Sequence, residues 1–352
     1  MKQFLFGGVC IFMLLAGCNN DKAVETTTEE PVVQEPAEQQ EQELEEEPSP
    51  FLHTFPLTGE GTDEAVDHRV IGIMIENSKS ARPQSGLYQA DLVYEVLAEG
   101  SITRLLAFYH SEQPEVIGPV RSARDYYVHL NNGYDAIYVS AGGSPDALAM
   151  VEKGQVDHIS GLAYDGKYFH RSSARKAPHN MYTSHEKLTK AIEEKGHHTA
   201  FNITSLPFLK EDESGNIDDP MAITATEVEI NYGSATNNVM YQYDEERNQY
   251  LRFNGGVQIV DLENGEPVAA TNLFIVEMSH KVIDNAGRRD INLTSGGQAL
   301  LVQNGQAQKV EWKNVDGQIL PYKDGEPLYF VKGKTWINII PTNPGVENVV
   351  IN

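Results

Sequence analysis

The sequence predicts an α+β fold in two parts, an N-terminal α/β-type domain followed by a mainly antiparallel all-β domain. About 300 residues follow an acidic N-terminal stretch, which is more than one hydrophobic core usually serves. Before residue 220, buried-strand runs alternate with helix-start signals, whereas after it the helical period disappears and hairpin turns take over. We therefore expect an α/β domain at 51–220 and a β-rich domain at 221–352.

The first 17 residues are typical of a lipoprotein signal peptide. Lys2 supplies positive charge, and an apolar run from Phe4 to Leu15 ends at the lipobox Leu15-Ala16-Gly17-Cys18. The run is too short to span about 30 Å of hydrocarbon, which argues against a transmembrane anchor. We expect residues 1–17 to be removed and Cys18 to carry acyl chains such as palmitate, which fixes the protein to the outer face of the cytoplasmic membrane.

Cysteine chemistry is excluded from the mature chain. Cys10 lies in the discarded segment and Cys18 is consumed by the lipid, so neither a free thiol nor a disulfide remains. No other spacing of ligands predicts a metal site or a cofactor, and His197-His198 lacks further ligands and is expected at the surface.

Residues 18–50 predict a disordered acidic tether. This stretch holds eleven Asp or Glu against one Lys, with repeated Gln and Pro and almost no apolar residues. The whole chain has a net charge of −24, and residues from 51 onward still carry −15. A body this acidic argues against nucleic acid as a partner.

In the N-terminal domain, apolar runs predict four strands and three helix starts. The strands are expected at Val70 to Ile75, Leu92 to Leu97, Ile102 to Tyr109 and Ala136 to Ser140. The helix starts are expected at Ser122 with Asp125, Ser144 with Pro145, and Thr183 with Glu186.

In the C-terminal domain, short strands such as Val239 to Tyr243 and Asn272 to Met278 are separated by turn dipeptides. These are Asn264-Gly265, Asn304-Gly305, Asp316-Gly317 and Asp324-Gly325, which favour hairpins. The polar stretch from Glu211 to Pro220 is a candidate linker.

Arginine is concentrated in the first domain, where seven of eleven arginines fall between Arg69 and Arg175. Arg121 and Arg124 flank a predicted helix start, which favours an anion, although both could equally pair with nearby carboxylates such as Glu95. Gly142-Gly143-Ser144 follows a predicted strand and leads into a helix, so it could let a ligand approach the backbone. The plainer interpretation of Ser144 is a helix cap.

The densest group of functional side chains runs from Phe169 to Asn180 and is expected to be a loop. Its arginines could grip a phosphate or carboxylate, with His170 and His179 as titratable neighbours; a solvated basic loop is the alternative. The candidate ligand-binding residues of the whole domain are Arg82, Arg121, Ser122, Arg124, Gly142, Gly143, Ser144, Arg171, Arg175, His179 and Asn180.

Several carboxylates could join the same cleft. Glu76-Asn77 ends the first strand, and Glu95 and Glu99 have the even spacing that would place both on one side of a strand. Paired carboxylates suggest glycosidase chemistry.

The chain resembles the YerB-like lipoproteins of Gram-positive bacteria, a family of unknown function. The resemblance extends over nearly all of the chain after the tether, and it implies two domains and a lipid anchor without assigning catalytic residues. The matching stretches are 81–87, 90–95, Ile117-Gly118-Pro119-Val120-Arg121-Ser122-Ala123-Arg124, Gly142-Gly143-Ser144, Arg175-Lys176-Ala177-Pro178-His179-Asn180 and Gly333-Lys334-Thr335-Trp336-Ile337.

Three functions remain open. The leading hypothesis is a non-catalytic lipoprotein that binds an anionic envelope component, such as a wall polymer or peptidoglycan fragment, through the arginine-rich region. The second is a cell-wall-acting hydrolase or transferase that uses His179 or Glu95 as acid or base, with Ser144 or water as nucleophile. The third is a protein-interaction module that offers edge strands of the β domain to a membrane partner.

Overall fold

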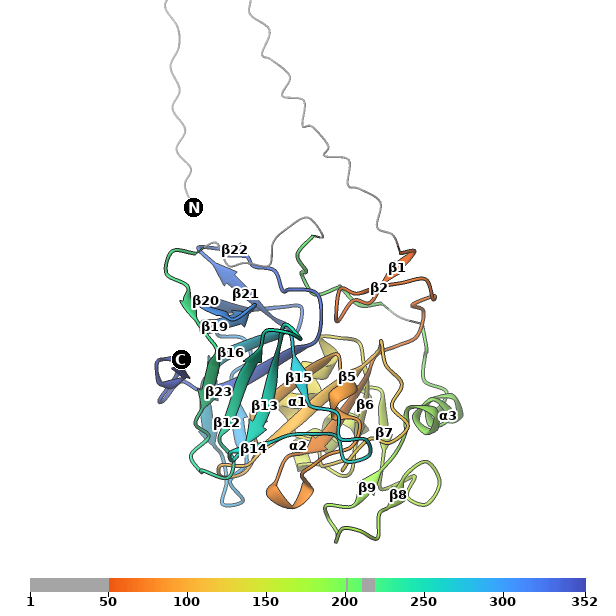
Figure 1. Cartoon of the computed structure of the whole chain (residues 1–352). Helices are drawn as coiled ribbons and strands as arrows, with labels where there is room; N and C mark the ends of the chain where they lie inside the picture. The colour runs from red at the N-terminus through yellow and green to blue at the C-terminus, as the bar shows by residue number, and fades with distance from the viewer. Residues whose placement is uncertain (1–50, 201, 211–218) are drawn as a thin grey trace, which may run out of the picture. The chain divides into compact units, whose positions relative to one another are not determined.

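The computed structural model of the chain describes residues 51–200, 202–210 and 219–352 (Figure 1). The predicted signal peptide, lipidated Cys18, acidic tether and most of the predicted linker lie outside these described residues. No helix within the described ranges is both long enough and apolar enough to cross a membrane.

Three α-helices are present in the described residues, and all of them precede residue 200. They are α1 (Asp125–Asn132), α2 (Pro145–Glu152) and α3 (His185–Lys195), and three short 3-10 helices accompany them: η1 (Lys79–Ala81), η2 (Leu87–Gln89) and η3 (Val346–Asn348). Helix α2 begins as predicted, because the Ser144 hydroxyl accepts a hydrogen bond from the backbone N–H of Ala147 at 3.3 Å, with Pro145 in the first turn.

Two of the three predicted caps are wrong. Helix α1 starts only at Asp125, because residues 121 to 123 are held extended: the N–H of Arg121 bonds to Met74 and the N–H of Ala123 to Gly142. The hydroxyl of Ser122 donates to Ala141 instead of capping the helix. At α3 the cap is Ser184, one residue beyond the predicted Thr183. The Thr183 hydroxyl donates instead to the carbonyl of Tyr168.

One large sheet contains most of the strands, in the spatial order β22-β21-β20-β19-β16-β23-β4-β5-β3-β6-β7, with β10 beside β20. Its strands are β3 (Ile71–Glu76), β4 (Leu92–Leu97), β5 (Thr103–Tyr109), β6 (Ile137–Ser140), β7 (His158–Ser160), β10 (Ile223–Thr224), β16 (Asn272–Met278), β19 (Gly297–Gln303), β20 (Gln306–Val315), β21 (Gln318–Lys323), β22 (Glu326–Pro327) and β23 (Thr335–Pro341).

This sheet is built from both halves of the chain. Strand β4 pairs in parallel with β23, from Leu92 opposite Thr335 to Val96 opposite Ile339. The predicted boundary near residue 220 therefore does not separate two sheets, although helices lie only before it. The fold is mostly β with largely antiparallel pairing, as predicted for the second half, and the four predicted N-terminal strands are confirmed as β3 to β6.

A second sheet has the order β14-β13-β12-β11-β24, with β15 beside β13. Its strands are β11 (Glu227–Ile230), β12 (Val239–Asp244), β13 (Gln249–Asn254), β14 (Val257–Gln258), β15 (Ala269–Ala270) and β24 (Val350–Ile351). Three two-stranded pairs complete the fold: β1 (His53–Thr54) with β2 (Gly61–Thr62), β8 (His170–Arg171) with β9 (Met181–Tyr182), and β17 (His280–Val282) with β18 (Arg289–Ile291).

Three of the four predicted turn dipeptides join strands of the large sheet. Asn304-Gly305, Asp316-Gly317 and Asp324-Gly325 all have positive φ and connect β19 to β20, β20 to β21 and β21 to β22. Asn264-Gly265 instead lies in a loop closed by the pairing of Val260 with Pro267, so it joins no two named strands.

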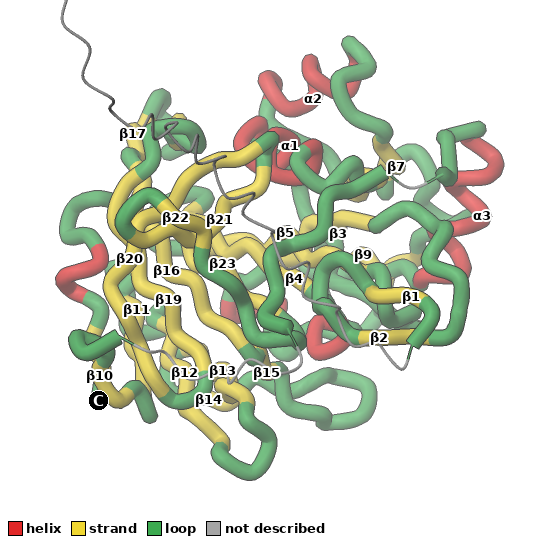
Figure 2. Tube along the Cα trace, turned by 90° about the horizontal axis from the view of Figure 1, so that it is seen from above, coloured by secondary structure: helices red, strands yellow, loops and turns green. Residues whose placement is uncertain are grey.

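Helices cover the two faces of the large sheet differently (Figure 2). Tyr126, Tyr127 and Leu130 of α1 pack in one core with Tyr94 and Phe108. The opposite face packs with α3 through Leu188, Ala191 and Ile192, and it also contacts the second sheet. The loops that follow β3 on this second face position the candidate site.

Candidate functional site

The candidate site is organised around the 76–84 segment, which follows β3 and contains η1. Glu76 ends the strand and is almost fully buried, with 4% of its surface exposed. The amide of Gln84 donates to the carbonyl of Glu76 at 3.0 Å and to the side chain of Asn77 at 3.1 Å. These bonds close the segment into a fixed loop, so the side chains on it have defined positions.

His179 and Arg121 meet at the Glu76 carboxylate. The Nδ1 atom of His179 lies 2.8 Å from Oε1 of Glu76, and the hydroxyl of Ser78 donates to the same oxygen at 2.9 Å. Nε of Arg121 lies 3.6 Å from Oε2, a charge contact without a hydrogen bond. Arg121 and His179, both predicted as site residues, therefore lie at one carboxylate. That carboxylate belongs to Glu76, which was also expected at the cleft.

Arg175 supports the backbone of the 76–84 segment. Its guanidinium donates to the carbonyl of Ala81 and, at 2.5 Å, to that of Pro83. Arg175 thereby fixes the loop that presents Arg82. Its role in this structure is to position the site, while direct contact with a ligand stays a prediction.

Arg82 and Lys79 line a cavity of about 380 Å³ between the 76–84 segment and the β13–β14 hairpin. Arg82 is held from one side, because its Nη2 atom donates to the carbonyl of Thr236 at 2.9 Å. Its buried Nε atom has no hydrogen-bond partner in the described structure. The complete lining, in which the described residues include no carboxylate, is Lys79, Arg82, Pro83, Thr236, Asn254, Gly255, Val257, Gln258, Ile259 and Val260.

The electrostatic surroundings of Arg82 are positive. Burial lowers the pKa of Arg82 from its usual value, the nearby Arg252 lowers it further, and Glu95 opposes both. An arginine remains protonated in spite of such a shift. The cavity, which we call the Lys79–Arg82 cavity, therefore combines two cations with apolar walls in an otherwise acidic chain.

Glu95 takes no part in an open cleft, because it is fully buried in an ion pair with Arg252 of β13. Nη2 of Arg252 donates to both carboxylate oxygens, at 3.0 and 2.9 Å, and Nε1 of Trp336 donates to one of them at 3.1 Å. Thr103 and Asn77 donate to the other oxygen at 2.8 and 3.2 Å. These contacts saturate the carboxylate.

Glu99 lies apart from Glu95, contrary to the predicted carboxylate pair. It comes after the end of β4 and binds Arg104 at 2.8 Å through one oxygen and the Nε atom of Arg124 at 2.9 Å through the other. For Arg124 the sequence left open either an anion site or a structural ion pair. In the structure Arg124 forms the ion pair, with Glu99. The even spacing failed because Glu99 lies in a turn rather than on the strand.

The Gly142-Gly143-Ser144 loop packs against the chain beside Arg121. Ala123 pairs with Gly143, and the N–H of Ser144 donates to Ala123 at 3.1 Å. Gly142 has a φ of 76°, which suits glycine. Since the Ser144 hydroxyl caps α2, the plainer interpretation of this residue is confirmed as its structural role.

The remaining candidates lie on the loop that β8 and β9 close. Arg171 donates to Asp165 at 2.9 Å and to the Asn180 side chain at 3.2 Å, while Asn180 also donates to Ser172 at 3.4 Å. Arg171 is exposed, so an anion could still reach it, and its role as a ligand residue stays a prediction.

Sequence reasoning missed Lys79, Asn254 and Arg252. The arginine pattern of the sequence does not include Lys79. The strand that contains Arg252 alternates half-buried and buried positions, with Tyr250, Arg252 and Asn254 all inward. That alternation could have marked Arg252 as a buried cation in need of a partner. His197, predicted at the surface, is in fact mostly covered and lies 3.1 Å from Asp157.

Within the described residues, no group of three or more His, Cys, Asp or Glu side chains is placed to hold a metal ion. The side chains around the 76–84 segment provide guanidinium, ammonium, imidazole and carboxylate groups.

Comparison with known proteins places the chain in a family. Residues 57–198 match the N-terminal domain, and residues 228–337 the C-terminal domain, of the family described as protein of unknown function DUF3048. The chain is 47% identical over 289 residues to YerB of Bacillus subtilis (strain 168), which is named as a lipoprotein; the match covers 81% of this chain and 86% of that protein. The crystal structure of YerB from Bacillus subtilis superimposes with a TM-score of 0.77 at 44% identity, covering 85% of this chain and 99% of the other. The chain therefore belongs to the YerB-like family of DUF3048-domain proteins.

Proposed function

We propose that the protein is a lipid-anchored binding protein on the outer face of the cytoplasmic membrane, and that its ligand is an anionic component of the cell envelope. The lipobox at Cys18 supports the anchor, and the name of the Bacillus subtilis relative agrees with it. A wall polymer or a peptidoglycan fragment is the class of ligand that such a location makes available.

The observation that carries this proposal is that Lys79 and Arg82 line the same cavity, and that the described lining of this cavity holds no carboxylate. Residues from 51 onward have a net charge of −15, so two cations without a counter-ion are unusual here. Lys79 is exposed and takes part in no ion pair of the described structure, and Nε of Arg82 is buried without a partner. A phosphate or carboxylate in the cavity would supply the negative charge that its described lining lacks.

The walls of the Lys79–Arg82 cavity favour a ligand with an apolar part next to its charge. Pro83, Val257 and Ile259 provide apolar surface, while the amide of the buried Asn254 is already hydrogen-bonded within the protein. A polymer of phosphodiester-linked polyols, or a glycan with carboxylates, has CH groups between its charges. Both classes of ligand therefore match a cavity with cations and apolar walls. They differ in the charged group, which is a phosphate in the first and a carboxylate in the second.

Binding to poly(glycerol phosphate) tests the proposal, with a carboxylate-bearing muropeptide as the second probe. The protein is the mature chain with Cys18→Ser, which stays free of lipid, and calorimetry gives the affinity. We expect Lys79→Gln and Arg82→Gln each to weaken binding about tenfold, since a charge-assisted contact contributes on the order of 1.5–3 kcal/mol. Lys153→Gln, an exposed lysine outside the lining, is the matched control and should bind as the parent does.

Equal affinity of all four proteins for both probes would refute this site. If Lys79→Gln and Arg82→Gln weaken binding of only one of the two probes, the anion of that probe, phosphate or carboxylate, is the one that the site recognises. Lys79→Gln removes no contact of the described structure, so its fold should be unaffected even where Arg82→Gln lowers stability through the lost bond to Thr236.

A second candidate function is hydrolysis of the same ligand, and the contact between His179 and Glu76 favours it. A carboxylate 2.8 Å from Nδ1 orients the imidazole so that Nε2 could act as a base towards water. Glu95 and Ser144, the other residues of the enzyme hypothesis, are engaged in the buried ion pair and the helix cap. Release of glycerol phosphate from the polymer, lost in His179→Gln, would establish an enzyme; an intact polymer after prolonged incubation would eliminate this candidate.

A further inference from the structure

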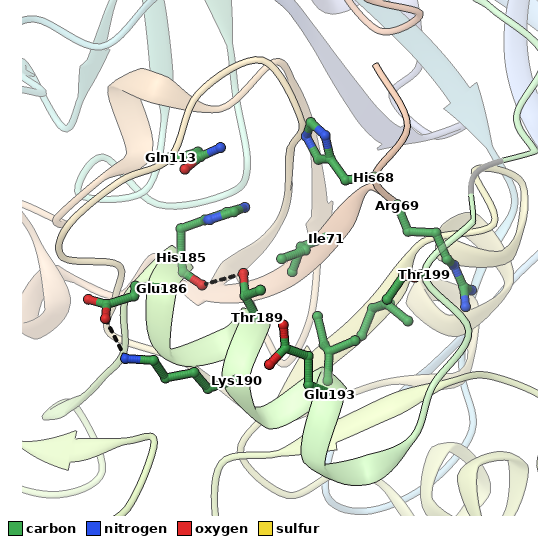
Figure 3. A pocket seen from close by; sticks show the side chains of 12 residues that line it. His68, Arg69, Ile71, Gln113, His185, Glu186, Thr189, Lys190, Glu193 and Thr199 are labelled. Atoms are coloured by element: carbon green, nitrogen blue, oxygen red, sulfur yellow. Dashed lines mark hydrogen bonds and ion pairs between the residues drawn. The ribbon is translucent and has the colours of Figure 1, made fainter. Parts of the chain in front are cut away.

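A second cavity, separate from the Lys79–Arg82 cavity, lies between α3 and the strands β3 and β6. Its volume is about 510 Å³, within the range of small-molecule sites. Figure 3 shows Thr189 of α3 close to Ile71 of β3, with Glu186 and Lys190 extending away from that strand. The described lining is His68, Arg69, Ile71, Gln113, Ile137, His185, Glu186, Thr189, Lys190, Ile192, Glu193 and Thr199. We call it the α3 cavity.

Three isoleucines form the apolar surface of the α3 cavity. Ile71 and Ile137 are directly opposite in the ladder of β3 and β6, and Ile192 belongs to α3. All three are buried in the core that the helix and the sheet share. They provide a firm wall for a flat or compact apolar group, because their positions are set by packing around them.

Two histidines supply hydrogen-bonding groups at the α3 cavity. Nε2 of His68 lies 2.9 Å from the carbonyl of His110 and is therefore engaged. The ring of His185 has no hydrogen-bond partner among the described residues, and burial followed by the charge of His68 lowers its pKa. His185 is accordingly neutral at pH 7, and a neutral imidazole offers one acceptor nitrogen.

The only arginine of the lining is already paired. Arg69 lies between two carboxylates, 3.1 Å from Asp135 and 2.5 Å from Asp157, and it also donates to the carbonyl of His198 at 3.0 Å. Arg69 and its two carboxylate partners together carry a net negative charge, so Arg69 does not attract an anionic ligand to the cavity.

The α3 residues that line the cavity carry two carboxylates, Glu186 and Glu193, and one ammonium group, Lys190. Lys190 pairs with Glu186 one turn earlier on the helix, as the dashed line in Figure 3 marks. Glu193 has no ion pair among the described residues, and it is four residues after Thr189 and so on the same side of the helix. The described lining thus presents an unpaired anion and no unpaired cation.

We propose that the α3 cavity binds a small organic amine, with its apolar body on Ile71, Ile137 and Ile192 and its ammonium group directed to Glu193. The neutral ring of His185 accepts a hydrogen bond from the ligand. The charge preference is opposite to that of the Lys79–Arg82 cavity, so the two sites take different ligands. This inference does not depend on the proposed function.

Three probes with the same apolar body separate charge from shape: 2-phenylethylamine, 2-phenylethanol and 3-phenylpropanoate. Calorimetry with the mature Cys18→Ser chain should give the order amine, alcohol, carboxylate from tightest to weakest. We expect the amine to bind at least tenfold more tightly than the carboxylate, because Glu193 attracts the first and repels the second.

Two variants locate the binding. Thr189→Trp places a large ring in the cavity from an exposed helix position and should abolish binding of all three probes. Glu193→Gln should weaken the amine three- to tenfold and leave the alcohol unchanged. Glu152→Gln, an exposed glutamate on α2, is the matched control.

Two results would overturn the inference. Binding of 2-phenylethylamine that survives Thr189→Trp, in a variant with the parent's thermal midpoint, would place the amine elsewhere. A carboxylate probe that binds as tightly as the amine would show that Glu193 does not select the charge. If Thr189→Trp does not fold, Thr189→Leu fills less of the cavity and is expected to weaken the amine about tenfold.

Discussion

The buried ion pair of Glu95 with Arg252 predicts how strongly the two halves of the chain are joined. Glu95 lies on β4 and Arg252 on β13, and neither side chain is exposed to solvent. The carboxylate accepts bonds at 3.0 and 2.9 Å from Arg252 and at 3.1 Å from Trp336. The guanidinium also lies over the Trp336 ring, 4.8 Å from its centroid.

Glu95→Gln keeps the shape of the side chain and removes its charge. Arg252 then stays buried as a cation without a counter-ion, with the like charge of Arg82 nearby. Removing one partner of a buried pair costs about 3–5 kcal/mol, a large part of the 5–15 kcal/mol that stabilises a typical domain. We expect the free energy of unfolding to fall by about that amount.

The double variant Glu95→Gln with Arg252→Met separates the ion pair from general damage to the core. It removes both charges, so it should be more stable than Glu95→Gln alone, because no buried charge is left without a counter-ion. If the double variant has a lower free energy of unfolding than Glu95→Gln, this electrostatic explanation is contradicted.

Urea unfolding followed by tryptophan fluorescence measures these changes. Trp312 and Trp336 are the only two tryptophans of the chain, and both are buried. Glu347→Gln, which breaks the exposed pair with Lys309, is the control and should leave the midpoint unchanged. A loss below about 1 kcal/mol for Glu95→Gln would refute the reasoning, since it falls within the range of surface ion pairs.

Two further predictions concern stability. Gly133→Ala would place a Cβ atom 2.4 Å from the backbone of Gly317, so it should lower the free energy of unfolding by about 1–3 kcal/mol, measured by urea unfolding; a stable variant would mean that α1 and the β20–β21 turn are not in contact. Burial lowers the pKa of His158 to about 4 in the folded protein. Because the unfolded state binds this proton near pH 6.5 and the folded state does not, stability is constant above pH 6.5 and falls as the pH drops towards 4, by up to about 3 kcal/mol. His158→Gln should reduce that loss in unfolding measured at pH 7, 6, 5 and 4, and an unchanged pH profile would contradict the assignment.

The local elements of the fold could be predicted because their signals are local. The run from Leu92 to Leu97 is apolar enough to indicate a buried strand, and Ser144 followed by proline indicates a helix start. The caps at Ser122 and Thr183 failed for a physical reason. Each hydroxyl has a carbonyl partner, Ala141 or Tyr168, that belongs to a different part of the sequence.

The joining of the two halves into one sheet could not be predicted from local patterns. Leu92 of β4 lies opposite Thr335 of β23, and nothing in either segment states which strand it pairs with. The same holds for the Lys79–Arg82 cavity, whose other wall comes from residues 254 to 260. The arginine density predicts a ligand site in the N-terminal half, and this stays a prediction, because Arg124 and Arg171 are held by nearby carboxylates.

Chemical-shift mapping with a short glycerol phosphate oligomer tests the proposed anion site most directly. The protein is the mature Cys18→Ser chain, labelled with ¹⁵N and titrated at low ionic strength. The proposal predicts saturable shifts at the amides of residues 79 to 82 and 254 to 260, which are lost in Lys79→Gln with Arg82→Gln. Shifts confined to other parts of the body, such as the exposed loop around Arg171, would contradict it.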